Sequence, residues 1–153
     1  MPDASVNVHV AATAEKVFGL VTDLDRMGEW SPETTRLDLK GGATAAALGV
    51  AWTGHNAANG KTWKTDAKVT QLDAGRAFAF DVHVGPIKVA RWGYEIAADA
   101  DGAGCTLTET WTDQRGGLVK RLGAFMTKVV DRKAHNEAGM RETIGRIKAA
   151  AEA

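Results

Sequence analysis

The sequence contains very little cysteine: Cys105 is the only one among its 153 residues. A single cysteine excludes an intrachain disulfide framework and a cysteine-based zinc cluster. An excess of charge of either sign is also absent, because Lys plus Arg and Asp plus Glu both number 19. Nucleic-acid-binding domains normally carry a basic surface, so this balance gives no electrostatic case for a nucleic-acid partner.

Long apolar runs are missing as well. No segment approaches the ~20 consecutive apolar residues that a transmembrane helix needs. The opening "MPDASVNVHV" lacks the basic and apolar regions of a secretory signal peptide. The length suits one domain and is too short for two well-formed cores. We therefore predict a single cytoplasmic domain over residues 1–153, without integral membrane association, that is a monomer or a homodimer.

The charges are distributed unevenly along the chain. Residues 118–150 hold eight Lys or Arg against three acids, and the rest of the chain holds 11 against 16. One interpretation is a basic helix that lies on an acidic sheet. The other is a helix that binds a membrane surface or RNA.

The hydrophobic pattern changes period along the chain. "SVNVHV" alternates and predicts a half-buried strand. "AATAEKVFGLVTDLDRMGEW" has helical spacing and a candidate N-cap, Thr13, and predicts two short helices, the second starting at Asp23 and ending before Pro32. From about Arg36 the period becomes two, which predicts six strands over residues 35–40, 49–57, 61–72, 76–84, 87–97 and 105–113. Turn signals such as Asn59-Gly60 join them, so we expect an antiparallel meander.

The last segment returns to helical spacing. Apolar residues recur at three- and four-residue steps from Leu118 to Ile147 and predict one long amphipathic helix. A sheet of about seven strands curls, and a helix of this length fits its concave side. The fold class expected is therefore α+β, with a curved antiparallel sheet that grips the long C-terminal helix and leaves a cavity between them.

That order of elements resembles the helix-grip fold of the START-like (SRPBCC) superfamily. "VNVHVAATAEKVFGLVTDLDRMGEWSPE" is similar to the opening of that superfamily. "TGHN" followed by a tryptophan, "GRAFAFDV" and "TLTETW" resemble strands of its bacterial polyketide cyclase/dehydrase-like branch. The resemblance covers nearly the whole chain and implies a cavity for a hydrophobic ligand. It does not imply an enzyme, because the superfamily has no universal catalytic motif.

Strand parity predicts which side chains face that cavity. The apolar face of each strand should point inward, and the apolar line of the last helix should point toward the sheet. We therefore expect a ligand to be bound by these residues: Trp52, Gly54, Asn56, Trp63, Phe78, Phe80, Trp92, Tyr94, Glu109, Trp111, Phe125 and Val129. Gly54 and Gly93 lie inside strands, where a missing side chain permits a bend or leaves room for a ligand.

Metal and cofactor signals are weak. His9, His55 and His83 fall on the outward parity of their strands, and a histidine metal site needs several of them to converge. No nucleophile elbow or phosphate-binding glycine loop is present. We predict no metal site and no cofactor. His135, on the last helix, faces either the cavity or water.

Glu109 is the residue with the clearest chemical signal, because it is a carboxylate on the apolar parity of a late strand. Burying it ionised without a partner is costly, so we expect it to be paired, hydrated or protonated with a raised pKa. A carboxyl group that is neutral near pH 7 can serve as a general acid or base. The alternative is a structural partner for a group on the long helix or for Tyr94.

Two further features remain open. The apolar line of the last helix is interrupted by "DRKAHNE", where Lys133, Asn136 and Glu137 continue the inward direction from Val129. This polar patch faces either the cavity or solvent. Trp30 either plugs a small core beneath the short helices or closes the end of the cavity.

The sequence supports three hypotheses of function. The first is binding of a small hydrophobic or aromatic ligand, lipid- or polyketide-like, by the aromatic lining. The second is an aromatase/cyclase- or dehydratase-like enzyme in which Glu109 is the acid or base and Tyr94 or Asn56 polarises a carbonyl group. The third is a regulatory module that binds a protein partner. Parity does not separate the first two.

Overall fold

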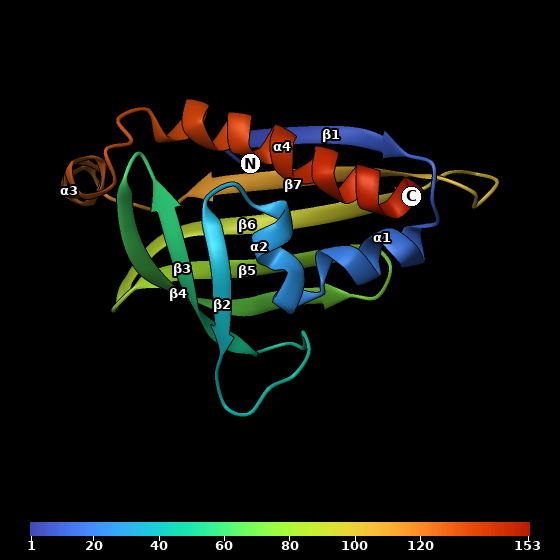
Figure 1. The fold of residues 1–153 in the computed structure, drawn as a ribbon, viewed down its shortest axis with the longest axis horizontal. Helices are drawn as coiled ribbons and strands as arrows, with labels where there is room; N and C mark the ends of the chain where they lie inside the picture. The colour runs from blue at the N-terminus through green and yellow to red at the C-terminus, as the bar shows by residue number, and fades with distance from the viewer.

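A seven-stranded antiparallel sheet curves around a C-terminal helix in the computed structural model, which describes residues 1–153 (Figure 1). The sheet order is β1-β7-β6-β5-β4-β3-β2. The strands are β1 (Ala4–Val10), β2 (Thr34–Leu39), β3 (Ala51–Ala58), β4 (Lys61–Asp73), β5 (Ala77–Val84), β6 (Ile87–Ala98) and β7 (Cys105–Asp113). β2 to β7 form the predicted meander, and β1 pairs with β7 at the far edge. The α+β helix-grip fold is thus confirmed.

The helices between β1 and β2 begin and end where the sequence indicates. The hydroxyl of Thr13 accepts a hydrogen bond from the Lys16 backbone N–H at 3.2 Å and caps α1 (Ala14–Val21). A 3₁₀ turn, η1 (Leu24–Arg26), leads into the short α2 (Met27–Trp30). Ser31 is extended, as the following Pro32 requires. These helices lie across the sheet beside β2 (Figure 1).

The β3–β4 hairpin confirms the expected tight turn. Asn59 and Gly60 both have positive φ, 51° and 74°. Two left-handed residues in a two-residue loop match the twist of the flanking strands. The resulting register places Trp63 opposite Asn56, so these two side chains lie on one face of the sheet.

The predicted long C-terminal helix is present as α4, but the expectation that it runs unbroken from Leu118 to Ile147 is wrong. The chain forms α3 (Gly117–Thr127) and α4 (Arg132–Glu152), separated at Lys128, whose φ is 57°. Asp131 begins α4 by accepting a hydrogen bond from the Ala134 N–H at 3.0 Å. The apolar spacing continues across the break by coincidence, because the apolar residues of α3 do not share the buried face of α4.

The core lies between the sheet and α4. Met140, Ile144 and Ile147 of α4 are buried in the main hydrophobic cluster with residues of β1, α1 and the central strands. α4 lies along the sheet, whereas α3 projects beyond the ends of the strands (Figure 1). No helix of the structure has the length and apolarity required to span a membrane.

Candidate ligand-binding cavity

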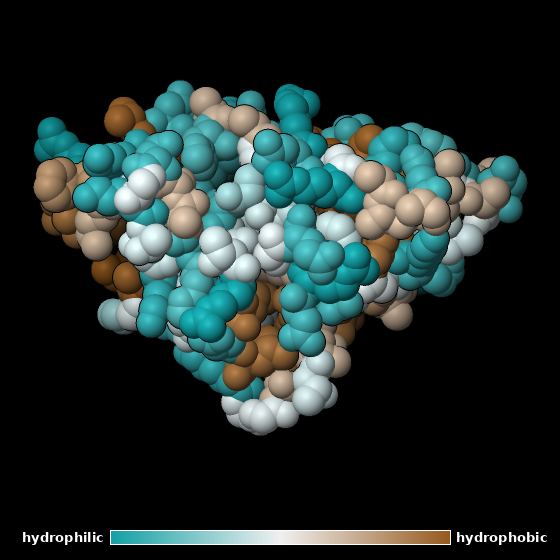
Figure 2. Space-filling model, in the orientation of Figure 1, coloured by the Kyte–Doolittle hydropathy of each residue, from teal (hydrophilic) through white to brown (hydrophobic).

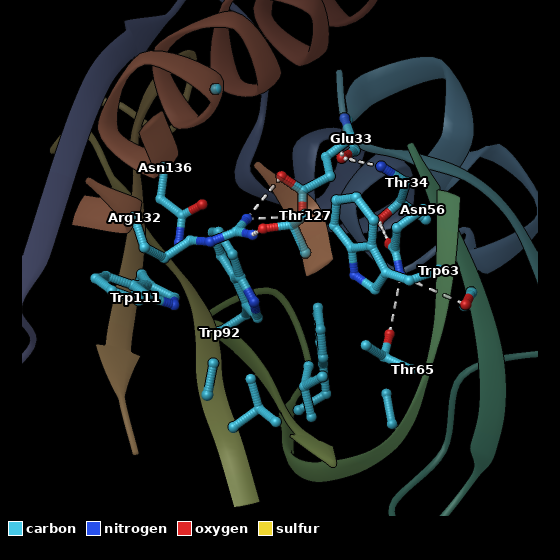
Figure 3. Close-up of a pocket in the computed structure, with 18 of the residues that line it drawn as sticks. Glu33, Thr34, Asn56, Trp63, Thr65, Trp92, Trp111, Thr127, Arg132 and Asn136 are labelled. Carbon is cyan, nitrogen blue, oxygen red and sulfur yellow. Dashed lines mark hydrogen bonds and ion pairs between the residues drawn. The ribbon is translucent and has the colours of Figure 1, made fainter. Parts of the chain in front are cut away.

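A cavity of about 310 Å³ lies between the concave side of the sheet and the helices α2, α3 and α4. Its position follows from the packing of α4: the second half of this helix is packed against the sheet, and the space beside its first half, from Arg132 to Thr143, is not filled. Figure 3 shows this space with Trp63, Trp92 and Trp111 around it and Arg132 crossing from α4. This volume is at the lower end of the range of small-molecule sites.

Most of the residues selected by parity lie on the cavity wall. They come from the five neighbouring strands β3 to β7, because consecutive strands of the meander present their inward faces side by side. The nine that line the cavity are Trp52, Gly54, Asn56, Trp63, Phe80, Trp92, Tyr94, Glu109 and Trp111. Their contact with a ligand stays a prediction.

Three of the selected residues do not line the cavity. Phe78 is 1% exposed and packs beneath the wall, between Phe80 and Tyr94. Phe125 is 82% exposed on the outer side of α3, because the helix break rotates it away from the sheet. Val129 is buried in the link between the two helices. The expected inward direction of Phe125 and the cavity position of Val129 are therefore wrong. Both expectations assumed one continuous helix, and the chain breaks between α3 and α4.

Aromatic rings form much of the wall. All five tryptophans of the chain line the cavity, including Trp30. Trp52 meets Phe80 edge-on, with ring centroids 5.1 Å apart, and Trp92 lies 6.4 Å from Trp111. Trp30 has both expected roles, since it is buried with its indole N–H donating to the Leu20 carbonyl at 3.2 Å and it also closes one side of the cavity.

A buried carboxyl group and a phenol meet on the wall. Tyr94 and Glu109 are directly opposite on β6 and β7, and the Tyr94 hydroxyl donates to Glu109 Oε1 at 2.8 Å. Glu109 is 2% exposed, and its second oxygen, Oε2, has no hydrogen-bond partner. Burial raises the pKa of Glu109 to about 8, against the lowering effect of the Tyr94 hydrogen bond.

With a pKa of about 8, Glu109 is mostly protonated at pH 7. Its Oε1 then serves as the acceptor for Tyr94, and Oε2–H is a donor left without an acceptor in the protein. The pKa of Tyr94 is raised well above its usual value, first by burial and then by the neighbouring Glu109, so the phenol remains a donor. A buried donor without a partner is costly, and a ligand acceptor in the cavity can supply one.

An ionic cluster closes the side of the cavity between α4 and the α2–β2 connection. Arg132 donates to both carboxylate oxygens of Glu33 at 2.9 Å and to the Thr127 hydroxyl at 3.1 Å. His135 Nε2 lies 2.8 Å from Glu33 Oε2. The Arg132 guanidinium lies 5.7 Å from the Trp63 ring centroid. Figure 3 shows Arg132 pointing toward Glu33 and Thr127 above Trp92.

The polar side chains of the α4 segment "DRKAHNE" point in different directions, some toward the cavity and some toward solvent. Asn136 is buried and lines the cavity, and His135 lines it as well. Lys133 is exposed and Glu137 is only partly buried, so neither continues the inward line. The sequence therefore indicates a polar wall here but misassigns two of its three members.

Asn56 is held by its neighbours on the wall. The Thr34 hydroxyl donates to its amide oxygen at 3.0 Å, and its amide nitrogen donates to the Thr65 hydroxyl at 3.1 Å and to the Gly54 carbonyl at 3.4 Å. Because these bonds engage both its amide oxygen and its amide nitrogen, Asn56 serves to join β2, β3 and β4. This favours the structural alternative for Asn56, whereas Oε2 of Glu109 has no hydrogen-bond partner.

The outward histidines do not converge. His55 on β3 contacts Asp38 at 2.6 Å, and His9 on β1 contacts Asp99 at 2.7 Å. His83 lies on β5, and β4 separates it from β3. Gly93 also belongs to the outer face, where an added Cβ would lie 2.7 Å from the Thr110 hydroxyl, so Gly93 permits close strand packing and makes no room for a ligand.

Sequence reasoning missed Arg132, Glu33 and Arg115, all of which line the cavity. Glu33 lies in a connection, where parity does not apply. Arg132 is placed by the start of α4, and the signal that could have located it is Asp131, a preferred N-cap residue just before a run of helix formers. Arg115 follows the last strand and is fixed by a two-bond pair with Asp113.

Comparisons with known proteins agree with this architecture. The family model described as "Polyketide cyclase / dehydrase and lipid transport" matches residues 1–152. No curated protein sequence matches the chain.

Three solved structures illustrate the likeness of fold. A polyketide-cyclase-like protein from Corynebacterium glutamicum is 24% identical, with a TM-score of 0.57 over 97% of this chain and 88% of that one. The di-domain aromatase/cyclase (ARO/CYC) StfQ from the steffimycin biosynthetic pathway is 15% identical, with a TM-score of 0.70 over 97% of this chain and 50% of its own. The XoxI protein from Bacillus cereus is 11% identical, with a TM-score of 0.67 over 99% of this chain and 96% of its own. On the match of the family model, this chain belongs to the polyketide cyclase/dehydrase and lipid transport family.

Proposed function

We propose that the protein binds a small hydrophobic or aromatic ligand, lipid- or polyketide-like, in the cavity between sheet and helices. The observation that carries the proposal is an open space of about 310 Å³ with all five tryptophans of the chain on its wall. Rings of this kind bury large apolar areas and stack on flat ligands. Family membership supports a ligand-binding or polyketide-processing role.

The wall also indicates what such a ligand carries. Protonated Glu109 offers one donor, Oε2–H, that has no hydrogen-bond partner within the protein. A carbonyl or hydroxyl oxygen at that point satisfies the donor, whereas a pure hydrocarbon leaves it unpaired. We therefore expect a mainly apolar molecule with at least one oxygen acceptor to bind more tightly than its hydrocarbon analogue.

Tryptophan fluorescence tests the proposal directly, because every tryptophan faces the cavity. Titration with flat aromatic ketones and with fatty acids should quench or shift the emission in a saturable manner. Ala67→Leu adds volume at a buried cavity position and should weaken binding about tenfold or more. Ala97→Leu makes the same change on the exposed side of β6 and is the matched control. Equal binding by the two variants, or none by the wild type, contradicts the proposal.

The second candidate function is catalysis of a cyclisation or dehydration by Glu109. Glu109 lines the cavity and its buried Oε2 has no hydrogen-bond partner, which favours this role specifically. The protonated carboxyl can give its proton to a ketone oxygen as a carbon nucleophile attacks, or to a hydroxyl that leaves as water, and the carboxylate formed can then take the proton lost from carbon. The Tyr94 hydroxyl, at 2.8 Å from Oε1, stabilises that carboxylate.

Glu109→Gln separates the two candidates. The amide keeps an acceptor for Tyr94 and nearly the same shape, so binding measured by fluorescence should change by less than about tenfold. Under the catalytic hypothesis, turnover of a poly-β-ketone mimic falls to background while binding persists. Unchanged turnover excludes Glu109 as the acid or base, and loss of binding together with folding shows a purely structural residue.

A further inference from the structure

The outer side of α3 is an apolar surface with no protein packed on it. Leu118 and Phe125 of α3 are 81% and 82% exposed, and Val130, in the link that follows this helix, is 90% exposed. Leu122 and Met126 are also more than half exposed. We call these five residues the α3 patch. Figure 2 shows hydrophobic atoms at the left end of the molecule, where Figure 1 places α3. Large apolar side chains gathered in this way mark an interaction site.

The α3 patch is continuous with the inside of the cavity. Leu122 and Met126 belong to the patch and line the cavity as well. Val84 and Ile87, at the β5–β6 turn, are likewise both exposed and cavity-lining. The tip of this hairpin and α3 lie at the same end of the molecule (Figure 1). An apolar path therefore runs from the outside of α3, over the rim, to the tryptophan-lined wall.

Positive charge surrounds this surface. Residues 117–133 contain five Lys or Arg and one acid, Asp131. Lys120 pairs with Asp113 and Arg132 with Glu33. Arg121, Lys128 and Lys133 are exposed, and no carboxylate lies within salt-bridge distance of them. Lys61 and Lys88 add two more exposed cations at the neighbouring hairpin tips.

The geometry points to the surface of an anionic lipid bilayer as the partner of the α3 patch. A helix with protruding Leu and Phe side chains beside Lys and Arg is the arrangement that lies in a membrane interface, and exposed cations are attracted to anionic headgroups. An RNA partner would account for the charge but not for the exposed Phe125 and Leu118. Because Leu122 and Met126 of the patch also line the cavity, docking there places the rim of the cavity against the lipid and lets an apolar ligand pass without crossing water.

Vesicle sedimentation tests this inference with the full chain. The protein should sediment with vesicles of equal parts phosphatidylcholine and phosphatidylglycerol, and much less with phosphatidylcholine alone. Sodium chloride at about 0.5 M should reverse most of the binding, because it screens the headgroup charge. The double variant Leu118→Ser/Phe125→Ser should lower the partition coefficient about tenfold or more. Leu48→Ser, also at an exposed leucine but in the β2–β3 loop, is the matched control.

Charge reversal gives an independent arm. Lys88→Glu/Arg121→Glu should abolish binding to the anionic vesicles, whereas Lys16→Glu/Lys68→Glu, with the same net charge and exposed positions elsewhere, should retain most of it. Circular dichroism verifies that each variant is folded.

Absence of vesicle binding by the wild type, or equal binding by all variants, overturns the inference. So does a dimer in sedimentation velocity that Leu118→Ser/Phe125→Ser dissociates, because a second copy then covers the patch. The fluorescence titration of the cavity is unaffected by any of these outcomes.

Discussion

At the scale of the residue, Glu109 shows how far a parity argument reaches. Alternation along "CTLTETW" places its carboxyl on the buried face, and the structure confirms that position. Burial there raises the pKa of the carboxyl group to about 8. The identity of the partner stayed open in the sequence, because the register between β6 and β7 decides it. Once Tyr94 lies directly opposite, one oxygen is satisfied and the other is not.

The raised pKa predicts a pH dependence of stability. Between the ordinary value of 4.5 and about 8, the folded protein holds a proton on Glu109 that the unfolded chain releases. The free energy of unfolding should therefore fall as pH rises through this window and level off above about pH 8. Glu109→Gln should remove that part of the slope. Urea unfolding at about pH 5, 7 and 9, which span this window, measures the slope of the free energy of unfolding against pH. A slope for Glu109→Gln equal to that of the wild type contradicts the assignment.

At the scale of the element, the break between α3 and α4 is where sequence reasoning failed. Apolar residues at helical spacing continue from Leu118 to Ile147, so periodicity alone predicts one helix. Two local signals oppose it: the N-cap Asp131 and the two β-branched residues Val129 and Val130 before it. These outweigh the pattern because the apolar residues of α3 gain little by continuing, as only Thr127 of that helix is buried.

Two substitutions at Lys128 test the break. A non-glycine residue at φ 57° is strained, so Lys128→Gly should be more stable than Lys128→Ala by about 1 kcal/mol. In a continuous helix the order reverses, because glycine is then worse than alanine by about 1 kcal/mol. Both variants remove the same charge, so their difference isolates the backbone. Thermal and urea unfolding supply the comparison, and a more stable alanine variant contradicts the break.

At the scale of the whole molecule, alternation and turn residues were sufficient for the fold. Six period-two segments with short Gly- and Asn-containing joins leave little choice but a meander, and the C-terminal helix must then cover its apolar face. The cavity wall followed from the same parity. Its ionic side did not, because Glu33, Thr127 and Arg132 come from segments between or at the ends of elements, whose positions only the assembled fold determines.

The uneven packing of the molecule predicts an uneven local stability. Six residues of α4 are buried, among them Met140 and Ile147, whereas α3 buries one and lies at the rim of the sheet. Backbone amides of α3 should therefore exchange by local opening, well before those of β6, β7 and the second half of α4, which exchange only on global unfolding. Hydrogen exchange followed by mass spectrometry resolves these segments. Protection of α3 equal to that of α4 in the free protein contradicts the prediction. Because Val119, Leu122 and Met126 line the cavity, a ligand that fills it should slow exchange in α3 more than in the strands, which links the stability of this helix to occupancy of the site.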